Sequence, residues 1–176
     1  MTLNGAPVTN HLLLPGWTQY NQTCQYDTFD ITSLLHEGDN AAGLFLGNGM
    51  YNSTGGRYSK FVGSFGPLKA IAQIRLEYAD GTVQILGTDE SWKTHAGPIT
   101  FSCVYGGEDY DARLEQPGWD RAGFDDSAWD PGLVVQGPGG NLRGQSAAAC
   151  PIGKFDVFSP VHVNPISADT TVYDLG

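Results

Sequence analysis

The near absence of helical periodicity is the feature that most limits how this sequence can fold. Glycine and proline occur 24 and 10 times in 176 residues, and they divide the apolar residues into short segments. Only residues 32–35 have the composition of a helical turn, which Gly38 would end. Many short strand signals separated by Gly and Pro predict an all-β fold, a jelly-roll β-sandwich.

The clearest strand signal is a hairpin. Apolar and polar residues alternate along residues 71–78, and residues 83–86 form the returning strand. Between them, we expect Asp80-Gly81 to supply the positive φ angles of a tight turn. Asn4-Gly5 predicts a second hairpin turn. Further strands are expected at residues 28–31, 42–46, 99–105 and 133–136.

Two long connections interrupt the strand pattern. Residues 47–67 are rich in glycine and tyrosine, and residues 106–130 are acidic and aromatic. Loops this long in a compact domain are usually functional. Residues 137–151 predict a loop or linker, and residues 172–176 predict a strand at the start of a following domain. We therefore expect residues 1–176 to be one domain cut from a larger protein.

The charge of the chain argues against two classes of partner. A net charge of −10, with nine basic residues and no basic run, does not suit nucleic acid or an anionic membrane surface. No segment reaches the roughly 18 apolar residues of a membrane span. A neutral ligand, or one bound through a cation, fits this composition better.

Two sequons are compatible with secretion, and we expect a secreted or extracellular protein although the first residues do not resemble a signal peptide. The sequons are Asn21-Gln22-Thr23 and Asn52-Ser53-Thr54. The three cysteines are too widely spaced for a metal knuckle, and either one disulfide with one free thiol or buried free thiols would fit them. The four tryptophans are expected to be packing residues. These cysteines and tryptophans are Cys24, Cys103, Cys150, Trp17, Trp92, Trp119 and Trp129.

Residues 105–113 are the richest candidate for a functional site, with three carboxylates, two tyrosines and an arginine. If the segment is extended, Glu108 and Tyr110 share one face. Asp109 and Asp111 then share the other face, where two carboxylates could bind a hard cation such as calcium. The alternative is that the arginine pairs with a neighbouring carboxylate and the tyrosines pack in the sandwich.

The loop at residues 47–67 holds groups suited to sugar recognition. A sugar needs a flat apolar surface for its C–H face and planar polar groups for its hydroxyls. Asparagines in this loop could also complete a calcium shell. The alternative is that the tyrosines only anchor the loop against the core. The candidate residues are Asn48, Tyr51, Asn52, Arg57 and Tyr58.

Catalysis by these residues is not expected. Hydrolysis of a glycosidic bond needs two carboxylates about 5 Å apart, or about 6.5–9.5 Å apart. Only five glutamates occur, and Glu108 has no obvious carboxylate partner in a buried setting. No Gly-X-Ser-X-Gly motif is present, and the histidines are scattered. A small glycosidase or lyase that uses residues 108–111 is the alternative.

Six segments, taken together, resemble the N-terminal accessory domain of bacterial and fungal α-L-rhamnosidases of the glycoside hydrolase family 78 type. They occur in the order and spacing typical of that domain, over roughly residues 3–135. The segments are Leu14-Pro15-Gly16-Trp17-Thr18, Gln25-Tyr26-Asp27-Thr28-Phe29-Asp30-Ile31-Thr32, Leu46-Gly47-Asn48-Gly49-Met50-Tyr51, Asp89-Glu90-Ser91-Trp92-Lys93, Gly107-Glu108-Asp109-Tyr110-Asp111-Ala112-Arg113 and Gly123-Phe124-Asp125-Asp126-Ser127-Ala128-Trp129.

The resemblance implies a galactose-binding-like jelly roll without catalytic residues, beside a separate helical barrel that carries the hydrolase chemistry. Related domains include the rhamnose-binding carbohydrate-binding module family 67, in which calcium bridges sugar hydroxyls. By this resemblance, calcium and sugar would lie at the loop after Leu46 and around Pro98. Many relatives have an acidic residue and a tryptophan where this chain has Asn48 and Met50, which weakens both expectations.

We therefore expect a non-catalytic module that binds terminal L-rhamnose or a similar sugar through calcium, in the same chain as a catalytic domain. A purely structural domain that braces the catalytic barrel is the main alternative. The expected sugar-binding residues are Asn48, Tyr51, Asn52, Arg57, Tyr58, Glu108 and Tyr110. The expected metal-binding residues are Asn48, Pro98, Asp109 and Asp111.

Overall fold

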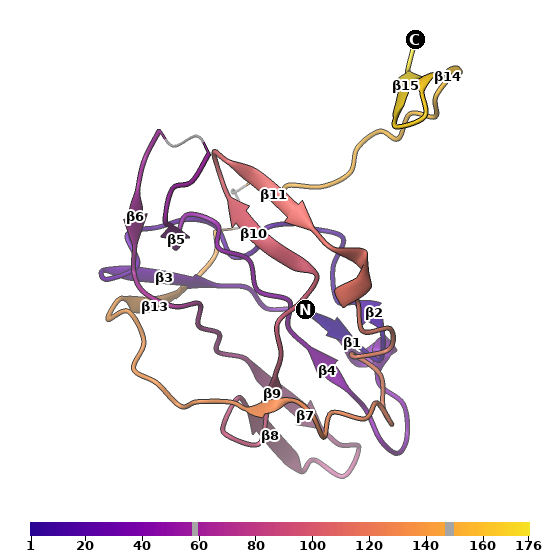
Figure 1. The fold of residues 1–176 in the computed structure, drawn as a ribbon. Coiled ribbons are helices and arrows are strands. Elements are labelled where there is room, and N and C mark those ends of the chain that lie inside the picture. The colour runs from indigo at the N-terminus through magenta and orange to yellow at the C-terminus, as the bar shows by residue number, and fades with distance from the viewer. Residues whose placement is uncertain (58–59, 147–149) are drawn as a thin grey trace.

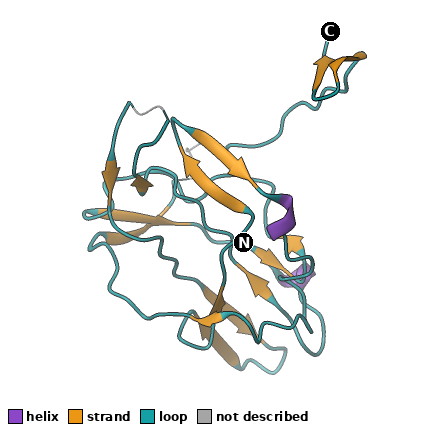
Figure 2. Ribbon diagram, viewed as in Figure 1, coloured by secondary structure: helices purple, strands orange, loops and turns teal. Residues whose placement is uncertain are grey.

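The structure is a computed structural model, and it describes residues 1–57, 60–146 and 150–176. Nearly all of its regular structure is β, as the sequence predicts, and two single 3-10 turns, η1 (Thr32–Leu34) and η2 (Ala112–Leu114), are present (Figures 1 and 2). The strands are β1 (Thr2–Leu3), β2 (Ala6–Pro7), β3 (Thr23–Tyr26), β4 (Ala42–Gly43), β5 (Asn52–Ser53), β6 (Gly63–Ser64), β7 (Gln73–Glu77), β8 (Val83–Gly87), β9 (Lys93–Thr94), β10 (Ile99–Cys103), β11 (Gly107–Tyr110), β12 (Asp130–Pro131), β13 (Asn141–Gly144), β14 (His162–Ser167) and β15 (Thr170–Asp174).

Both predicted hairpin turns are present. Asn4 and Gly5 have φ angles of 54° and 80° and join β1 to β2. β7 and β8 pair from Gln73 opposite Gly87 to Glu77 opposite Val83, and every second residue of β7 is half-buried. In the second turn only Gly81 has a positive φ, of 85°. The prediction was therefore wrong for Asp80, whose carboxylate instead accepts a 2.9 Å hydrogen bond from the backbone N of Thr82.

Several predicted strands are shorter than expected or do not form. Residues 28–31 are not a strand, because the Asp30 carboxylate accepts a hydrogen bond from the Thr32 amide and begins the turn η1. Residues 133–136 have no partner strand among the described residues, and Leu133 is 84% exposed. The segments predicted at 42–46 and 99–105 shorten to β4 and β10. An apolar run in this chain forms a strand only where another segment lies beside it to pair with.

The long connection at 47–67 contains a small hairpin of its own, β5 and β6. Part of the segment expected to be a loop or linker is also a strand, because β13 pairs in parallel with β3. This pairing joins residues more than a hundred positions apart, which local patterns do not reveal. Figure 1 places the hairpin β14–β15 apart from the other strands, and β15 begins at Thr170, earlier than the predicted 172–176.

The apolar core is thin and partly aromatic. The buried residues among those described are Leu3, Gly43, Ser53, Gly55 and Cys103. Trp119 packs near Phe45 and Trp129, with ring centroids 6.5 and 6.3 Å apart. Trp92, Trp119 and Trp129 are half-buried, as a packing role requires. Trp17 is 63% exposed, so the packing prediction was wrong for it.

The three cysteines are free, which excludes the disulfide that the sequence had left open. Cys103 is buried, Cys24 is half-buried and Cys150 is exposed. In the part of the chain that the structure describes, no helix has the length and apolar character needed to cross a membrane.

Candidate functional site

The candidate site is built on the antiparallel pair β10–β11, which supplies two faces. Phe101 lies opposite Asp109, and Ser102 lies opposite Glu108. Directly opposite residues of an antiparallel pair share a face, and successive residues alternate. The Phe101–Asp109 pair therefore faces one side, and the Ser102–Glu108 pair faces the other. Within residues 105–113 the chain is extended over β11, which meets the condition under which Glu108 and Tyr110 share one face, and it turns into η2 from Ala112.

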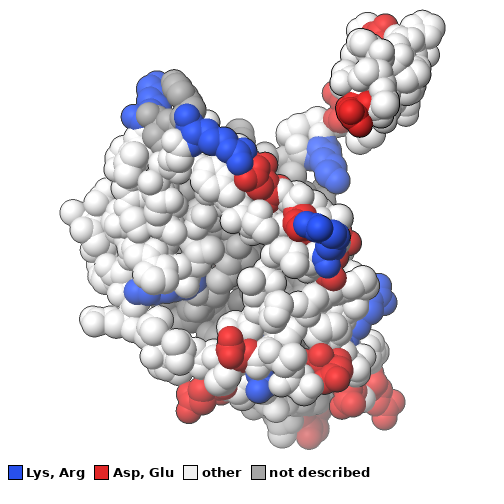
Figure 3. All heavy atoms as spheres, viewed as in Figure 1, with Lys and Arg blue, Asp and Glu red and all other residues white. Residues whose placement is uncertain are grey.

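Arg57 joins the first long loop to the second on the Phe101 face. Its guanidinium contacts both carboxylate oxygens of Asp109, with Nη1 2.8 Å from Oδ1. The Cζ atom of Arg57 also lies 5.2 Å from the centroid of the Phe101 ring, a cation–π contact. The two charged side chains stay accessible, at 63% and 42% exposure. Figure 3 shows basic and acidic side chains side by side over this strand pair and η2.

Gly56 allows this approach. A Cβ atom at Gly56 would lie 2.7 Å from Cζ of Phe101, and its φ of 140° is one that other residues rarely adopt. Glycine at this position lets the backbone lie against the ring and brings Arg57 over β11. The glycine-rich composition of the loop therefore has a geometric reason at this position.

Asn48 connects the same loop to β10 through hydrogen bonds to both the backbone and the side chain of Ser102. Its Nδ2 atom donates to the backbone O and to Oγ of Ser102, both at 3.0 Å. Its Oδ1 atom accepts from Nδ2 of Asn52 at 3.1 Å, and Oγ of Ser64 donates to Oδ1 of Asn52 at 2.7 Å. Both predicted asparagines therefore use their amides inside the protein, where they hold the loop in place.

Tyr51 anchors the loop and does not present a free ring. Its ring packs against Tyr20 and Phe65, with centroids 5.1 and 5.8 Å away, and its hydroxyl donates to the Phe65 carbonyl at 3.2 Å. Burial raises the pKa of Tyr51 above its ordinary value. These contacts favour the alternative in which this tyrosine is structural. Tyr58, also expected to contact sugar, lies outside the described residues.

Glu108 and Tyr110 belong to the outward side of β11. Tyr110 is 54% exposed, and its hydroxyl donates a hydrogen bond to the Glu115 carboxylate. This hydrogen bond raises the pKa of Tyr110, and burial and the nearby charges of Glu115 and Glu108 raise it further. An accessible aromatic ring beside two carboxylates has the groups that bind the C–H face and hydroxyls of a sugar.

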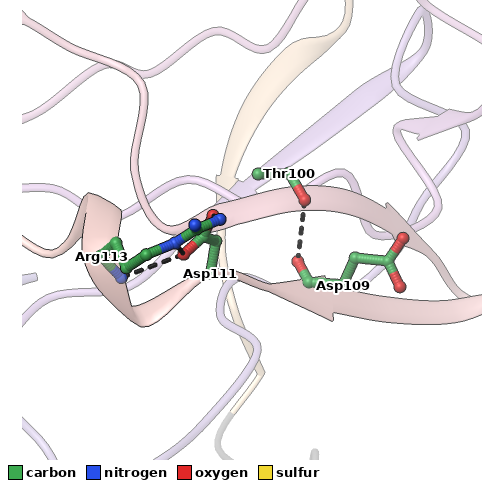
Figure 4. A network of polar contacts seen from close by, with 4 residues as sticks. All are labelled: Thr100, Asp109, Asp111 and Arg113. Atoms are coloured by element: carbon green, nitrogen blue, oxygen red, sulfur yellow. Dashed lines mark hydrogen bonds and ion pairs between the residues drawn. The ribbon is translucent and has the colours of Figure 1, made fainter.

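Asp109 and Asp111 do not converge on a common point. Figure 4 shows that their carboxylates point in different directions. Asp111 caps η2, accepting from the Arg113 backbone N at 3.0 Å and from its Nε at 2.8 Å, and this pairing lowers the pKa of Asp111. The backbone N of Asp111 donates to the Pro98 carbonyl at 2.9 Å.

The residues expected to bind calcium do not fit a calcium ion as they are placed. Each aspartate is paired with its own arginine, Asn48 directs its amide nitrogen at β10, and the Pro98 carbonyl already accepts a hydrogen bond. Calcium needs about six to eight oxygen ligands. Across residues 1–57, 60–146 and 150–176, no group of three or more His, Cys, Asp or Glu side chains is placed to hold a metal ion. The calcium site stays a prediction.

Three residues of this site were not singled out from the sequence. Phe101 and Ser102 lie opposite the acidic strand, and Glu115 follows η2. A hairpin centred on Tyr105 would have aligned residues 101 and 102 with residues 109 and 108. Phe101 and Ser102 could therefore have been found from the sequence, but only by assuming how the two strands of this hairpin pair.

We call the accessible surface around Arg57 and Asp109 on β10–β11 the rim. The fold and this rim define a small all-β domain whose two long connections, residues 47–67 and 106–130, are joined over one strand pair. Comparison with known proteins identifies it more closely. The family model described as the alpha-L-rhamnosidase N-terminal domain matches residues 1–154, and the chain belongs to this family. The predicted resemblance is confirmed.

Curated relatives are much longer than this chain. An alpha-L-rhamnosidase of Alteromonas sp. (strain LOR) is 36% identical over 99% of this chain and 19% of its own length. One of Formosa agariphila is 34% identical over 99% of this chain and 18% of its own. The chain thus spans about a fifth of the relatives it matches.

Solved structures agree with this assignment. The alpha-L-rhamnosidase from Dictyoglumus thermophilum matches 99% of this chain and 19% of its own, with a TM-score of 0.79 and 32% identity. The Streptomyces avermitilis enzyme, solved in complex with L-rhamnose, matches 78% of this chain and 13% of its own, with a TM-score of 0.65 and 33% identity. The predicted β-sandwich class is confirmed by these neighbours together with the all-β content.

Proposed function

We propose that this chain is a non-catalytic carbohydrate-binding domain of an α-L-rhamnosidase-type enzyme, and that it binds terminal L-rhamnose or a similar sugar on β10–β11. The catalytic domain of the same chain would be its partner, and rhamnose-containing glycans would be its ligands. The matching enzymes are called α-L-rhamnosidases, and one was solved with L-rhamnose, which suggests the ligand to test.

The observation that carries this proposal is the accessible Arg57–Asp109 pair. Two planar, charged groups are held in register by two parallel contacts, yet both remain accessible to solvent. Adjacent sugar hydroxyls can donate to such a carboxylate and accept from such a guanidinium without a new arrangement of either side chain. Because the groups are already ordered, little conformational entropy is lost on binding.

Tyr110 presents an apolar ring on the opposite face of the same strand, where it would contact a neighbouring part of the glycan and not the sugar ring held by Arg57 and Asp109. Its ring is half exposed, and the Glu115 carboxylate fixes the orientation of its hydroxyl. Since the site is open and has few anchors, we expect affinity in the millimolar range.

Catalysis by the cluster at residues 108–111 is not supported by the side-chain arrangement. Asp109 and Asp111 are each held by an arginine, and the Glu115 carboxylate accepts a hydrogen bond from Tyr110. Glycoside hydrolysis needs one carboxylic acid and one carboxylate facing each other across the scissile bond. A structural role without binding is the stronger rival, because Asn48 and Tyr51 are used to secure the loop.

Calorimetric titration of the chain with L-rhamnose tests the proposal. We expect weak, saturable heat, and the part of it that comes from binding at β10–β11 should be lost in Arg57→Ala. Absence of heat at saturating sugar in the wild-type chain would favour the structural role. A parallel titration in the presence of a calcium chelator tests the predicted calcium requirement, since binding through calcium would be abolished there. Secretion is part of the proposal and is tested by locating the natural protein in the culture medium.

A further inference from the structure

A polar cleft that shares no lining residue with the β10–β11 site lies at the ends of the parallel strands β3 and β13. It has a volume of about 350 Å³, within the lower range of small-ligand sites. Four chain segments meet there: residues 9–11, 27–29, 145–146 and 151. Its lining residues are Thr9, His11, Asp27, Thr28, Phe29, Gln145, Ser146 and Pro151.

The walls of this cleft are held in place by hydrogen bonds between the segments. The backbone N of Gln145 donates to the Tyr26 carbonyl at 2.9 Å. The Oε1 atom of Gln145 accepts from the Gly16 backbone N, also at 2.9 Å. The first bond continues the β3–β13 ladder beyond its last pair, Gly144 opposite Tyr26, and the second fastens the segment at Gly16 to the end of β13. The cleft is therefore formed by the fold itself and not by a single exposed loop.

Asp27 is the residue of this cleft whose carboxylate has unused capacity to accept hydrogen bonds from a ligand. It is half-buried, and no hydrogen bond to its carboxylate is formed by the described residues. Burial raises the pKa of this carboxyl, and the nearby His11 only partly opposes that effect. A half-buried carboxylate without donors leaves strong hydrogen-bonding capacity unused, and a ligand with hydroxyl donors would satisfy it.

The rest of the lining indicates what kind of ligand would fit. Phe29 is half-buried and supplies an apolar ring, while Thr9 and Thr28 bring hydroxyls and His11 an imidazole. A carboxylate beside an aromatic ring suits a small neutral ligand that has hydroxyls on its edge and C–H groups on its face. An anionic ligand would be repelled by Asp27.

We infer that this cleft is a second carbohydrate site, which binds one neutral sugar ring through the Asp27 carboxylate and the Phe29 ring. The site is independent of the proposed rim site on β10–β11, because it shares no residue with it. A domain with two separated weak sites would hold a branched or repeating glycan more strongly than either site alone, as linked binding events do.

Amide NMR of the chain carrying Arg57→Ala, which removes the rim site, tests the inference with L-rhamnose as the probe. We expect saturable shifts of the amide signals of Asp27 and Gln145 when L-rhamnose is added. The further change Asp27→Ala should weaken this binding at least tenfold. The anion D-glucuronate should cause no such shifts. Asp169→Ala, an exposed aspartate between β14 and β15, is the matched control. If Asp27→Ala fails to fold, Thr28→Trp fills the cleft from an exposed position and should also remove binding.

Two results would overturn the inference. Sugar-dependent shifts confined to the rim of the wild-type chain would leave the proposed function intact and rule out the second site. Cleft shifts that persist unchanged in Asp27→Ala, or that D-glucuronate reproduces, would exclude recognition through this carboxylate.

Discussion

Arg57 and Asp109, which are 52 positions apart in the sequence, face each other with Nη1 2.8 Å from Oδ1. This contact brings the segment between β5 and β6 onto the strand β11 and places a planar cation and a planar anion at one accessible rim. The first long connection is thereby joined to the second, which is the arrangement that a sugar site built from both loops requires.

Replacing Arg57 by Ala should weaken L-rhamnose binding at the β10–β11 rim at least tenfold and leave the melting temperature nearly unchanged. Accessible ion pairs contribute little to folding stability, whereas a fixed guanidinium contributes directly to hydroxyl recognition. Calorimetry and thermal unfolding measure the two effects on the same samples. Arg143→Ala, an exposed arginine on β13, is the matched control and should retain binding. A large loss of thermal stability in Arg57→Ala would assign the ion pair to folding instead.

Replacing Asn48 by Ala should destabilise the fold by about 1–3 kcal/mol, because it leaves the Ser102 carbonyl and the Asn52 amide without their partner. Denaturant unfolding gives this value directly. Asn164→Ala, on the exposed strand β14, should change the free energy of unfolding far less. Equal stability of the two variants would show that the Asn48 network does not hold the loop.

A substitution at Gly140, the residue before β13, tests the parallel pairing of β13 with β3. A Cβ atom at this position would lie 2.3 Å from the Tyr20 carbonyl oxygen and 2.7 Å from the Thr23 nitrogen, both backbone atoms. Gly140→Ala should therefore destabilise the chain by about 1–3 kcal/mol, as overpacking does. Gly137→Ala, where no atom lies within 4 Å, is the matched control and should be nearly neutral. A neutral Gly140→Ala would mean that β13 is not held against β3.

The sequence was most informative where structure is local. The turn at Asn4-Gly5 and the β7–β8 hairpin depend on neighbouring residues, and both could be predicted. The pairing of β3 with β13 depends on residues far apart, and no local pattern predicts it. The same limit applies to the site. The acidic strand could be singled out by composition, but which carboxylate meets which arginine depends on how a loop 50 residues earlier is folded.

The pH dependence of stability should show the cost of keeping Asp27 charged in its cleft. Since burial raises the pKa of Asp27 in the folded chain, the folded state binds this proton more tightly than the unfolded state, and stability falls as pH rises through that range. Asp27→Asn should therefore raise the melting temperature at pH 7. The difference should vanish below about pH 3.9, where aspartate is protonated in the unfolded chain as well.

Thermal unfolding across pH measures this effect, with the exposed Asp169→Asn as the matched control. Equal melting temperatures of wild type and Asp27→Asn at pH 7 would indicate that this carboxylate carries no desolvation cost.

Residue-by-residue NMR mapping of L-rhamnose on the wild-type chain tests the central claim most directly. Progressive, saturable movement of the amide signals of Arg57, Asp109 and Tyr110 is the predicted result. Unmoved signals at these three residues at saturating sugar would contradict the claim that the rim formed by the two loops recognises a saccharide.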